Sequence, residues 1–291
     1  MVPPAIVSPM TSPIISVLIP AYNRATTIEQ CIRSALAGGE PQIEIIVADN
    51  GSSDATVAVV EGLIREDARI SLIRHASNQG PLANWRSCLD QATGHYVHWL
   101  WSDDWIEPGC YRILLDGMRQ HDCQVGLCAA RIIDPVAGWY HLKYSLASLD
   151  HGRDRLLKQG LEAFFLPLSP AAALLPRASV LRHFHSDIPV VRRIDCNRKA
   201  MGADAVMILG AILDCERVHF HPEALVNFRH EESSITVSHA AGLRNAHYAW
   251  ARAWWARRHG LPRSWSFFDY LRLLHDRHFL SLAWGVVRGV I

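Results

Sequence analysis

The fold is decided by the opening stretch ISVLIPAYN, residues 15–23, where a short run of aliphatic residues ends in a polar loop. The same arrangement returns in IEIIVADNGSSD at residues 43–54 and in YVHWLWSDD at residues 96–104. Segments with helical periodicity separate these runs, and this alternation is typical of parallel strands joined by right-handed crossovers. The sequence therefore predicts an α/β fold.

The periodicity also gives approximate element positions. Strands are expected at residues 15–19, 43–48, 70–74, 96–101 and 124–130. Helices are expected from two overlapping capping-box patterns at residues 26–30, from residues 53–54, from residue 81 and after residue 108. Later come an apolar segment at 171–175, a helix at 203–213, strands at 218–220 and 224–228, and a helical pattern from residue 240.

Composition narrows the class of protein. The chain has 291 residues, of which 49% are hydrophobic and 20% charged, and a net charge of +1, as in ordinary globular proteins. Phosphate-backbone binding calls for a strongly basic face, so nucleic acid is not expected as a partner. Seven cysteines without a CxxC motif or a secretory leader predict a cytoplasmic protein. The longest apolar stretch, residues 279–291, is short of the roughly 20 residues that span a bilayer.

The loops after the strands are the expected ligand site, because ligands of open α/β sheets bind beyond the carboxyl ends of the strands. Those loops read PAYN from Pro20, DNGSSD from Asp49, NQG from Asn78 and SDD from Ser102. The adjacent carboxylates of Asp103 and Asp104 repel each other unless a cation compensates, and hard oxygen ligands suit Mg²⁺ or Mn²⁺ bound with a diphosphate. The alternative is a turn with an Asp helix cap.

Two residues of these loops could contact a nucleotide. Asp49 occupies the last strand position, where a carboxylate could accept hydrogen bonds from a base or a ribose. Part of its loop also has the composition of a turn and a helix cap. Tyr22 could offer its ring face to a nucleobase, or it could be a core tyrosine.

The four loops together are more specific than any one of them. In their order and spacing the chain resembles the inverting family 2 glycosyltransferases, clearly over residues 15–130 and weakly to residue 236. The resemblance implies a GT-A fold, with a Rossmann-like, mostly parallel central sheet flanked by helices, and a helical C-terminal extension. It implies a disordered tail at 1–13, a nucleotide-sugar-binding subdomain at 14–133, an acceptor-binding subdomain at 134–238 and the extension at 239–291.

The implied activity is metal-dependent transfer of a sugar from a nucleotide-diphosphate donor of the UDP, dTDP or GDP type to a hydroxyl. The acceptor would be a saccharide or a lipid-linked saccharide of bacterial surface polysaccharide or lipopolysaccharide assembly. By the resemblance, these residues would bind the donor: Pro20, Ala21, Tyr22, Asn23, Asp49, Asn78, Gly80, Asn84, Ser102, Asp103, Asp104 and Arg229.

The resemblance also implies where the metal and the catalytic base lie. The family's Asp-x-Asp falls on residues 101–103, so Trp101 replaces its first carboxylate and Asp103 matches the metal ligand, with Asp104 as an additional acid. The segment NFRHEESSIT, residues 227–236, resembles a family segment whose His completes the metal site; the register places either His230 or Glu231 there. Arg229 could pair with phosphate oxygens or with a surface acid.

Inverting transfer also needs a base that takes the proton of the acceptor hydroxyl. Asp204, at the start of the helix expected at 203–213, is the candidate by resemblance, although an Asp is also routine in a first helical turn. Asp195 is the alternative. Ala203 is a departure, because the family usually has Glu-Asp here.

Other functions fit less well. A nucleotidyltransferase would need a Gly-rich basic loop after the first strand, which PAYNR is not. A scaffold that binds the donor without turnover is conceivable because of Trp101 and Ala203. Zinc is not expected at the His183/His185 or His219/His221 pairs, because no further ligands lie at suitable spacing. The Trp- and Arg-rich C-terminal segment could contact a membrane surface or pack on the domain.

Overall fold

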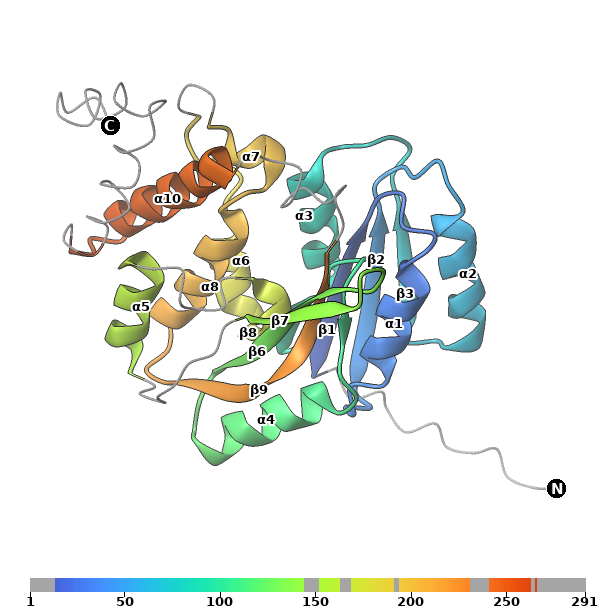
Figure 1. Ribbon diagram of the computed structural model, residues 1–291, viewed down its shortest axis with the longest axis horizontal. Coiled ribbons are helices and arrows are strands. Elements are labelled where there is room, and N and C mark those ends of the chain that lie inside the picture. The colour runs from blue at the N-terminus through green and yellow to red at the C-terminus, as the bar shows by residue number, and fades with distance from the viewer. Residues whose placement is uncertain are drawn as a thin grey trace.

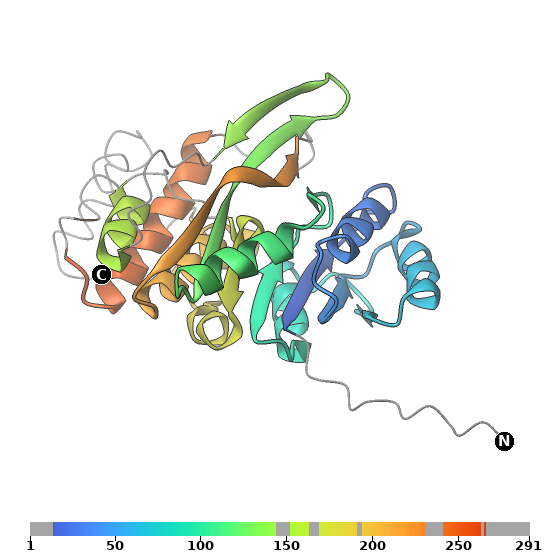
Figure 2. The same cartoon turned by 90° about the horizontal axis from the view of Figure 1, so that it is seen from below.

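A computed structural model describes residues 14–143, 152–162, 169–190, 194–230, 241–262 and 265 of the chain. The tail at 1–13, the segment at 231–240 and most of the chain beyond residue 262 lie outside the described residues. Figure 1 shows a central sheet with helices on both of its sides, and Figure 2 shows the same arrangement from below.

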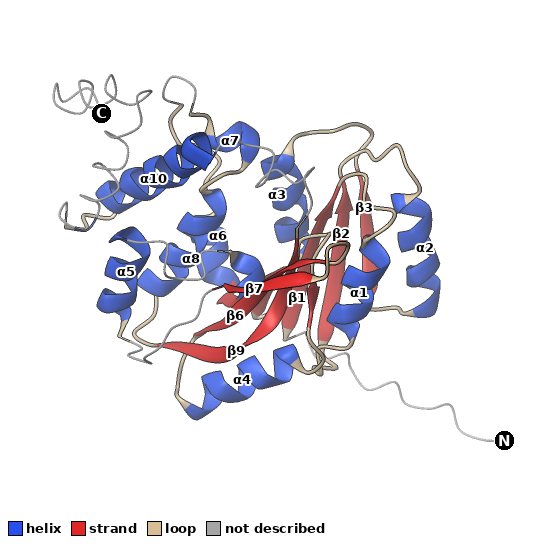
Figure 3. Cartoon of the chain, viewed as in Figure 1, coloured by secondary structure: helices blue, strands red, loops and turns tan. Residues whose placement is uncertain are grey.

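The sheet has the strand order β3-β2-β1-β4-β8-β6-β9-β5, and β7 pairs with β6 alone. Its strands are β1 (Ile15–Ala21), β2 (Ile43–Asp49), β3 (Ile70–Arg74), β4 (Tyr96–Trp99), β5 (Trp105–Ile106), β6 (Val125–Asp134), β7 (Trp139–Lys143), β8 (Ala173–Pro176) and β9 (Val218–Arg229). β3, β2, β1 and β4 run parallel, β6 and β9 also pair in parallel, and β5, β7 and β8 join in antiparallel pairings. Figure 3 shows this sheet in red at the centre of the molecule.

The helices cover the two faces of the sheet. They are α1 (Ile28–Leu36), α2 (Thr56–Glu66), α3 (Pro81–Gln91), α4 (Cys110–Gln120), α5 (Arg153–Glu162), α6 (Arg177–His183), α7 (Cys196–Lys199), α8 (Ala203–Leu213) and α10 (Ala241–Arg258), with a 3₁₀ turn η1 at Pro170–Ala172. Alternate residues of a strand point to opposite faces. Val17 and Ile19 therefore join the core under α1, α2 and α4, whereas Leu18 joins the core under α3, α5, α6, α8 and α10.

The predicted strands at 15–19, 43–48, 70–74 and 124–130 are confirmed as β1, β2, β3 and β6, and the helices at 81–91 and 203–213 as α3 and α8. β4 ends two residues earlier than predicted, at Trp99. The strands predicted at 218–220 and 224–228 are one strand, β9, because its pairing with β6 continues through a bulge. The predicted division into subdomains stays a prediction; β6 runs across its first boundary, at residue 133.

The capping boxes predicted before α1 were wrong. Thr27 is the N-cap by position, but its side chain makes no capping hydrogen bond. Its Oγ1 instead donates to the Ser102 carbonyl at 2.9 Å, so the hydroxyl ties α1 to the loop after β4.

The helical pattern predicted from residue 240 is confirmed where the structure describes it, as α10. This helix packs against α8, α5 and α7, on the left of Figure 1. Most of its described side chains are buried, including Trp250 and Trp255. Of the two alternatives for this segment, packing on the domain therefore holds for α10. Within the described residues, none of the helices has the length and apolar character needed to cross a bilayer.

Candidate active site

The loops after β1 and β2 are locked together at the carboxyl edge of the sheet. In the parallel pair, Ala21 lies opposite Asp49, so the two loops leave the sheet side by side. Asn23 adopts the left-handed conformation, φ 52°, which asparagine tolerates better than most residues. The side-chain Oδ1 of Asn23 accepts from the Ser53 backbone amide at 2.9 Å, and the Asn23 backbone amide donates to Ser52 Oγ at 2.8 Å. The predicted donor residue Asn23 thus shapes the site through its neighbours.

Tyr22 and Asp49 lie at this edge with opposite exposure. The Tyr22 residue is 44% exposed, which excludes the core-tyrosine alternative. Asp49 is buried; its Oδ2 accepts from the Ser52 amide at 3.0 Å, whereas its Oδ1 has no hydrogen-bond partner among the described residues. A buried carboxylate oxygen without a donor is costly, and most such oxygens in folded proteins are satisfied. Asp49 can therefore accept a hydrogen bond from a ligand.

Asn50, which the sequence analysis did not select, joins the loop after β3 to this site. The Asn50 Oδ1 atom accepts from the backbone amide of Gln79 at 2.8 Å, and the Asn50 Nδ2 atom donates to Asn78 Oδ1 at 3.1 Å. Asn78 Oδ1 also accepts from the Gly80 amide, at 2.9 Å. Asn78 and Gly80, which are predicted to bind the sugar donor, are thus held beside Asp49. A signal existed, because Asn50 lies inside the DNGSSD loop.

The start of α3 is fixed by Asn84, another predicted donor residue. The buried Asn84 side chain donates from Nδ2 to the Ala48 carbonyl at 2.9 Å, which anchors α3 on β2. Its Oδ1 has no partner among the described residues. The anchoring contact is structural, and donor binding by Asn84 stays a prediction.

The adjacent acids after β4 have different surroundings. Asp104 is buried, and its Oδ1 accepts from the Arg229 amide at 2.9 Å. The Asp103 side chain is 17% exposed, and its Oδ2 lies 3.5 Å from Nη2 of Arg24. Ser102 is buried and receives the Thr27 hydroxyl at its carbonyl. Asp104 therefore supports the loop, and Asp103 is the carboxylate that a ligand can reach.

Arg24 was missed by the sequence analysis. It directly follows the PAYN loop, and its Nη1 also donates to the Asn23 carbonyl at 3.1 Å. The residue brings a cation to the predicted metal ligand Asp103. The contact between Arg24 and Asp103 joins positions 79 residues apart in sequence. In the sequence, only the order of the strand-end loops could have suggested this contact.

Arg229 is the last residue of β9 and His230 follows it, and their side chains make different contacts. The Arg229 guanidinium donates from Nε to the Asp103 carbonyl at 3.1 Å and lies 5.1 Å from the ring centroid of Trp105. The His230 ring instead lies 5.1 Å from the Trp139 ring. Among the described residues, no three His, Cys, Asp or Glu side chains are grouped so as to hold a metal. The predicted metal ligands Asp103, Asp104 and His230 therefore do not form one cluster among the described residues. The alternative ligand, Glu231, lies outside the described residues. The metal site stays a prediction centred on Asp103.

Trp101, which the resemblance predicts to replace the family's first Asp, packs among other tryptophans. Its ring centroid lies 4.8 Å from that of Trp85 on α3 and 6.2 Å from that of Trp99. Its Nε1 donates to Ser169 Oγ at 3.4 Å. The indole therefore packs between the sheet and α3.

The predicted base Asp204 lies in the first turn of α8. Its Oδ1 accepts from the Gly202 amide at 3.0 Å and its Oδ2 from the Tyr248 hydroxyl at 2.7 Å. Burial raises the pKa of the Asp204 carboxyl to about 6, against the hydrogen bond from Tyr248, which lowers it. A carboxylate with this pKa is ionised at neutral pH and can accept a proton. Tyr248 was not selected from the sequence.

The rival base, Asp195, has a different position. Its carboxylate accepts from the Arg198 amide at 2.9 Å and so caps α7. Ala203 packs in one small cluster with Leu82 and the partly buried Trp85. Ala203, the neighbour of Asp204, and Trp101, two residues before Asp103, thus both pack around Trp85.

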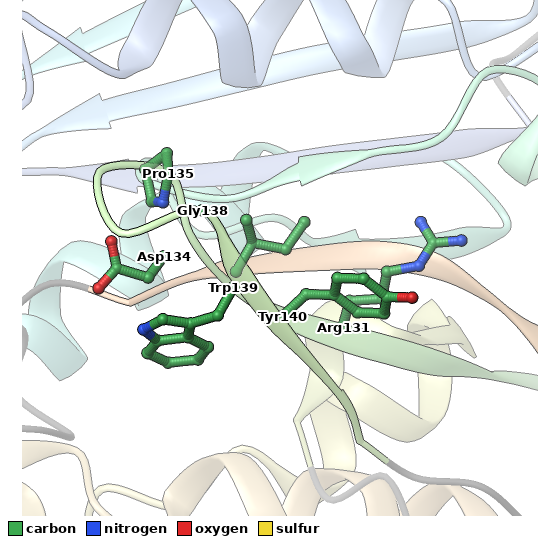
Figure 4. A pocket seen from close by; sticks show the side chains of 7 residues that line it. Arg131, Asp134, Pro135, Gly138, Trp139 and Tyr140 are labelled. Carbon is green, nitrogen blue, oxygen red and sulfur yellow. The ribbon is translucent and has the colours of Figure 1, made fainter.

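A shallow hollow of about 410 Å³ lies at the tip of the β6–β7 hairpin (Figure 4). The Tyr140 residue there is 67% exposed. The hollow is lined by Arg131, Ile133, Asp134, Pro135, Gly138, Trp139 and Tyr140. Arg131 is already paired with Glu107 at 2.8 Å, so the hollow offers no free cation. Its Trp139 contacts His230, which places the hairpin beside the end of β9.

A family model described as Glycosyl transferase family 2 matches residues 16–179, which are 164 of the 291 residues. An uncharacterized glycosyltransferase of Haemophilus influenzae is 37% identical over 97 residues, 33% of this chain and 39% of that protein. The GalNAc(5)-diNAcBac-PP-undecaprenol beta-1,3-glucosyltransferase of Campylobacter jejuni is 38% identical over 104 residues, 35% of this chain and 34% of that protein. The matched region spans little more than a third of the length of these relatives.

Solved structures share the fold. S. aureus TarS in complex with UDP-GlcNAc has a TM-score of 0.60 at 19% identity and covers 90% of this chain and 67% of its own. Mannosyltransferase PcManGT from Pyrobaculum calidifontis, in complex with GDP-Man and Mn²⁺, has a TM-score of 0.59 at 15% identity. The match covers 96% of this chain and 75% of the mannosyltransferase chain. The GT-A fold expected from the sequence is confirmed.

Proposed function

The chain belongs to glycosyl transferase family 2, and on that basis we propose that it moves a sugar from a nucleotide-diphosphate donor to an acceptor hydroxyl with inversion. The observation that carries the proposal is the buried Asp49 Oδ1, which has no partner among the described residues. It lies where three interlocked strand-end loops meet, beside the exposed Tyr22. This arrangement suits a base or ribose that donates to Asp49 and a base that stacks on Tyr22.

The donor class is supported by the neighbours. TarS is in complex with UDP-GlcNAc and the Pyrobaculum mannosyltransferase with GDP-Man, so both hold nucleotide sugars. The Campylobacter relative is named for transfer to an undecaprenol-linked saccharide. We therefore propose a UDP, dTDP or GDP sugar as donor. The proposed acceptor is a saccharide or lipid-linked saccharide of surface polysaccharide assembly, met at the cytoplasmic membrane face.

The residues present fit Mn²⁺ or Mg²⁺ as a cofactor. Such ions are commonly held by one or two carboxylates together with substrate phosphates. Asp103 supplies one accessible carboxylate, while the Asp104 carboxylate supports the Arg229 backbone. When bound, the ion would neutralise negative charge on the leaving diphosphate. Arg229, which lies against the Asp103 backbone, would contribute positive charge to the same region.

Asp204 is the proposed base. It takes the proton of the acceptor hydroxyl as that oxygen attacks the anomeric carbon, while the bond to the diphosphate breaks on the opposite side. Ala203, next to the proposed base, and Trp101, on the proposed donor side, both pack around Trp85, and in-line transfer requires that the protein hold both substrates in this region. With a pKa of about 6, the Asp204 carboxyl is mostly ionised at neutral pH and can take up a proton.

The test is turnover by Asp103→Asn and Asp204→Asn variants. A thermal-shift panel of nucleotide diphosphates and their sugars, with Mn²⁺, Mg²⁺ or chelator, first identifies the donor, because ligand binding raises the melting temperature. Nucleoside diphosphate release with an acceptor panel then measures transfer. We expect Asp204→Asn to lose roughly 100-fold or more in kcat and to keep donor binding.

Asp195→Asn is the matched control, because it changes the neighbouring carboxylate that caps α7. Near-normal turnover by Asp204→Asn would remove Asp204 as the base. Donor binding without turnover by the unaltered protein, with every acceptor tested, would favour a binding protein over an enzyme.

A further inference from the structure

We propose that Tyr248 of α10 is a positioning residue for the Asp204 carboxylate, which makes α10 part of the acceptor side of the active site. The proposal rests on the proposed function, because it assigns a role relative to the base. Tyr248 lies outside residues 16–179, the region that the family model matches.

The contact itself fixes the carboxylate at both oxygens. The Tyr248 hydroxyl donates to Oδ2 at 2.7 Å, and the Gly202 amide donates to Oδ1 at 3.0 Å. A hydroxyl that donates to a carboxylate at this distance forms a charge-assisted bond, roughly twice as strong as a neutral one. With one donor on each oxygen, the carboxylate cannot rotate without losing a hydrogen bond.

Tyr248 is in turn held by one turn of α10 that is clamped against α7 and α8. Cys196 Sγ donates to the His247 carbonyl at 3.5 Å, and the Asp195 amide donates to His247 Nε2 at 3.1 Å. Gly202 has φ +89°, and a Cβ there would lie 2.5 Å from the Ala251 methyl. His247 and Ala251, on either side of Tyr248, thus hold α10 against α7 and against the turn at Gly202 that begins α8.

The hydrogen bond also determines when the carboxylate is ionised. Burial raises the pKa of Asp204 to about 6, and the Tyr248 hydroxyl opposes this effect because it binds the charged form. Cys196, the first residue of α7, is a titratable neighbour of this carboxyl; Asp195 lies next to Cys196, and the Asp195 backbone amide donates to His247 of α10. Removal of the hydroxyl leaves backbone amides as the remaining donors, so the pKa should rise further.

The test is titration of Asp204 in the Tyr248→Phe variant without substrate. Phenylalanine keeps the ring and removes only the hydroxyl. Difference infrared spectra, with Asp204→Asn as the reference, report the protonated carboxyl band directly. We expect the midpoint to rise by about one pH unit, the size of effect that one charged hydrogen bond has. An unmoved midpoint would overturn the proposal.

Kinetics give a second readout once an acceptor is known. A rise of about one unit from a pKa near 6 lowers the ionised fraction about fivefold at pH 6 and only about twofold at pH 7. The acidic limb of kcat should move by the same amount, with donor KM unchanged. Trp250→Phe is the matched control, because it removes the α10 hydrogen bond to the Pro189 carbonyl, at 2.8 Å, which does not involve Asp204.

The two proposals can fail separately. Full turnover by Asp204→Asn refutes Asp204 as the base, whatever Tyr248→Phe does. An inactive Asp204→Asn combined with an unshifted limb in Tyr248→Phe, or with the same shift in Trp250→Phe, refutes the positioning role alone.

Discussion

Replacing Asp204 with asparagine should stabilise the protein at neutral pH while it abolishes transfer. In the folded protein, burial raises the carboxyl pKa from 3.8 to about 6, so the ionised form is disfavoured relative to the unfolded chain. The shift of about two units corresponds to about 3 kcal/mol at a pH above both values. Asparagine carries no charge and is free of this cost.

Part of the gain is offset by hydrogen bonding. The carboxylate accepts from both Tyr248 and Gly202, whereas the single oxygen of an asparagine amide can replace only one of the two acceptor atoms. The lost hydrogen bond costs about 1 kcal/mol, which leaves a net stabilisation of about 2 kcal/mol at pH 7.

The sign depends on pH. Because the folded-state pKa is raised, the wild-type carboxyl contributes most favourably below pH 3.8 and loses that contribution as the pH rises through about 6. The variant should therefore be the more stable protein at pH 7–8 and the less stable one near pH 4. Urea unfolding of both proteins between pH 4 and 8 measures the difference, and other titrating groups cancel in it.

Asp195→Asn is the control, because asparagine caps a helix about as well as aspartate, so this substitution should change the free energy of unfolding little. A difference between the wild type and Asp204→Asn that stays constant across this pH range, or an Asp204→Asn variant that is less stable at every pH, would refute the reasoning.

Three further substitutions probe the loops of the donor side. Gly51 has a φ of +74°, and Gly51→Ala would place a methyl 2.7 Å from a backbone carbon of Ser77. We therefore expect the free energy of unfolding in urea to fall by at least about 1–2 kcal/mol and donor binding to weaken in thermal shift. Unchanged donor binding would contradict the role of this loop. Thr27→Val leaves a buried carbonyl without its donor and should cost about 1–3 kcal/mol, whereas the exposed Thr26→Val should be neutral; equal losses would argue against the contact. Arg24→Gln removes the cation beside the proposed metal ligand, so Mn²⁺ alone should bind up to about fivefold more tightly in calorimetry; weaker binding would show that this carboxylate is not the ligand.

The parallel half of the sheet could be predicted because its strands are buried on both faces and read as continuous apolar runs. β5 and β8 could not, because two to four residues carry no periodicity and pair only with strands far away in sequence. Thr27 shows the same limit in a helix cap. Its local pattern favoured a capping box, but a carbonyl 75 residues away took the hydroxyl.

The site divides in the same way. Asp49, Asn78 and the acids after β4 were found because each lies at the end of a strand that the sequence reveals or in the loop that follows it. Arg24 and Tyr248 were not, since their roles come from ion pairing and helix packing across 79 and 44 residues. A hydrogen bond between two helices leaves no local signal in a single sequence.

The predicted replacement of the family's first Asp by Trp101 changes what we expect of the remaining acids. Two carboxylates are left in the loop, and Asp104 already binds the Arg229 amide in a buried position, where its charge would be costly without donors. Only Asp103 remains accessible, and it faces a guanidinium. A cation at this loop would thus gain little from the protein alone and most from the oxygens of a diphosphate. We therefore predict that metal and donor bind together at Asp103, with the carboxylate supplying one ligand and the diphosphate the others.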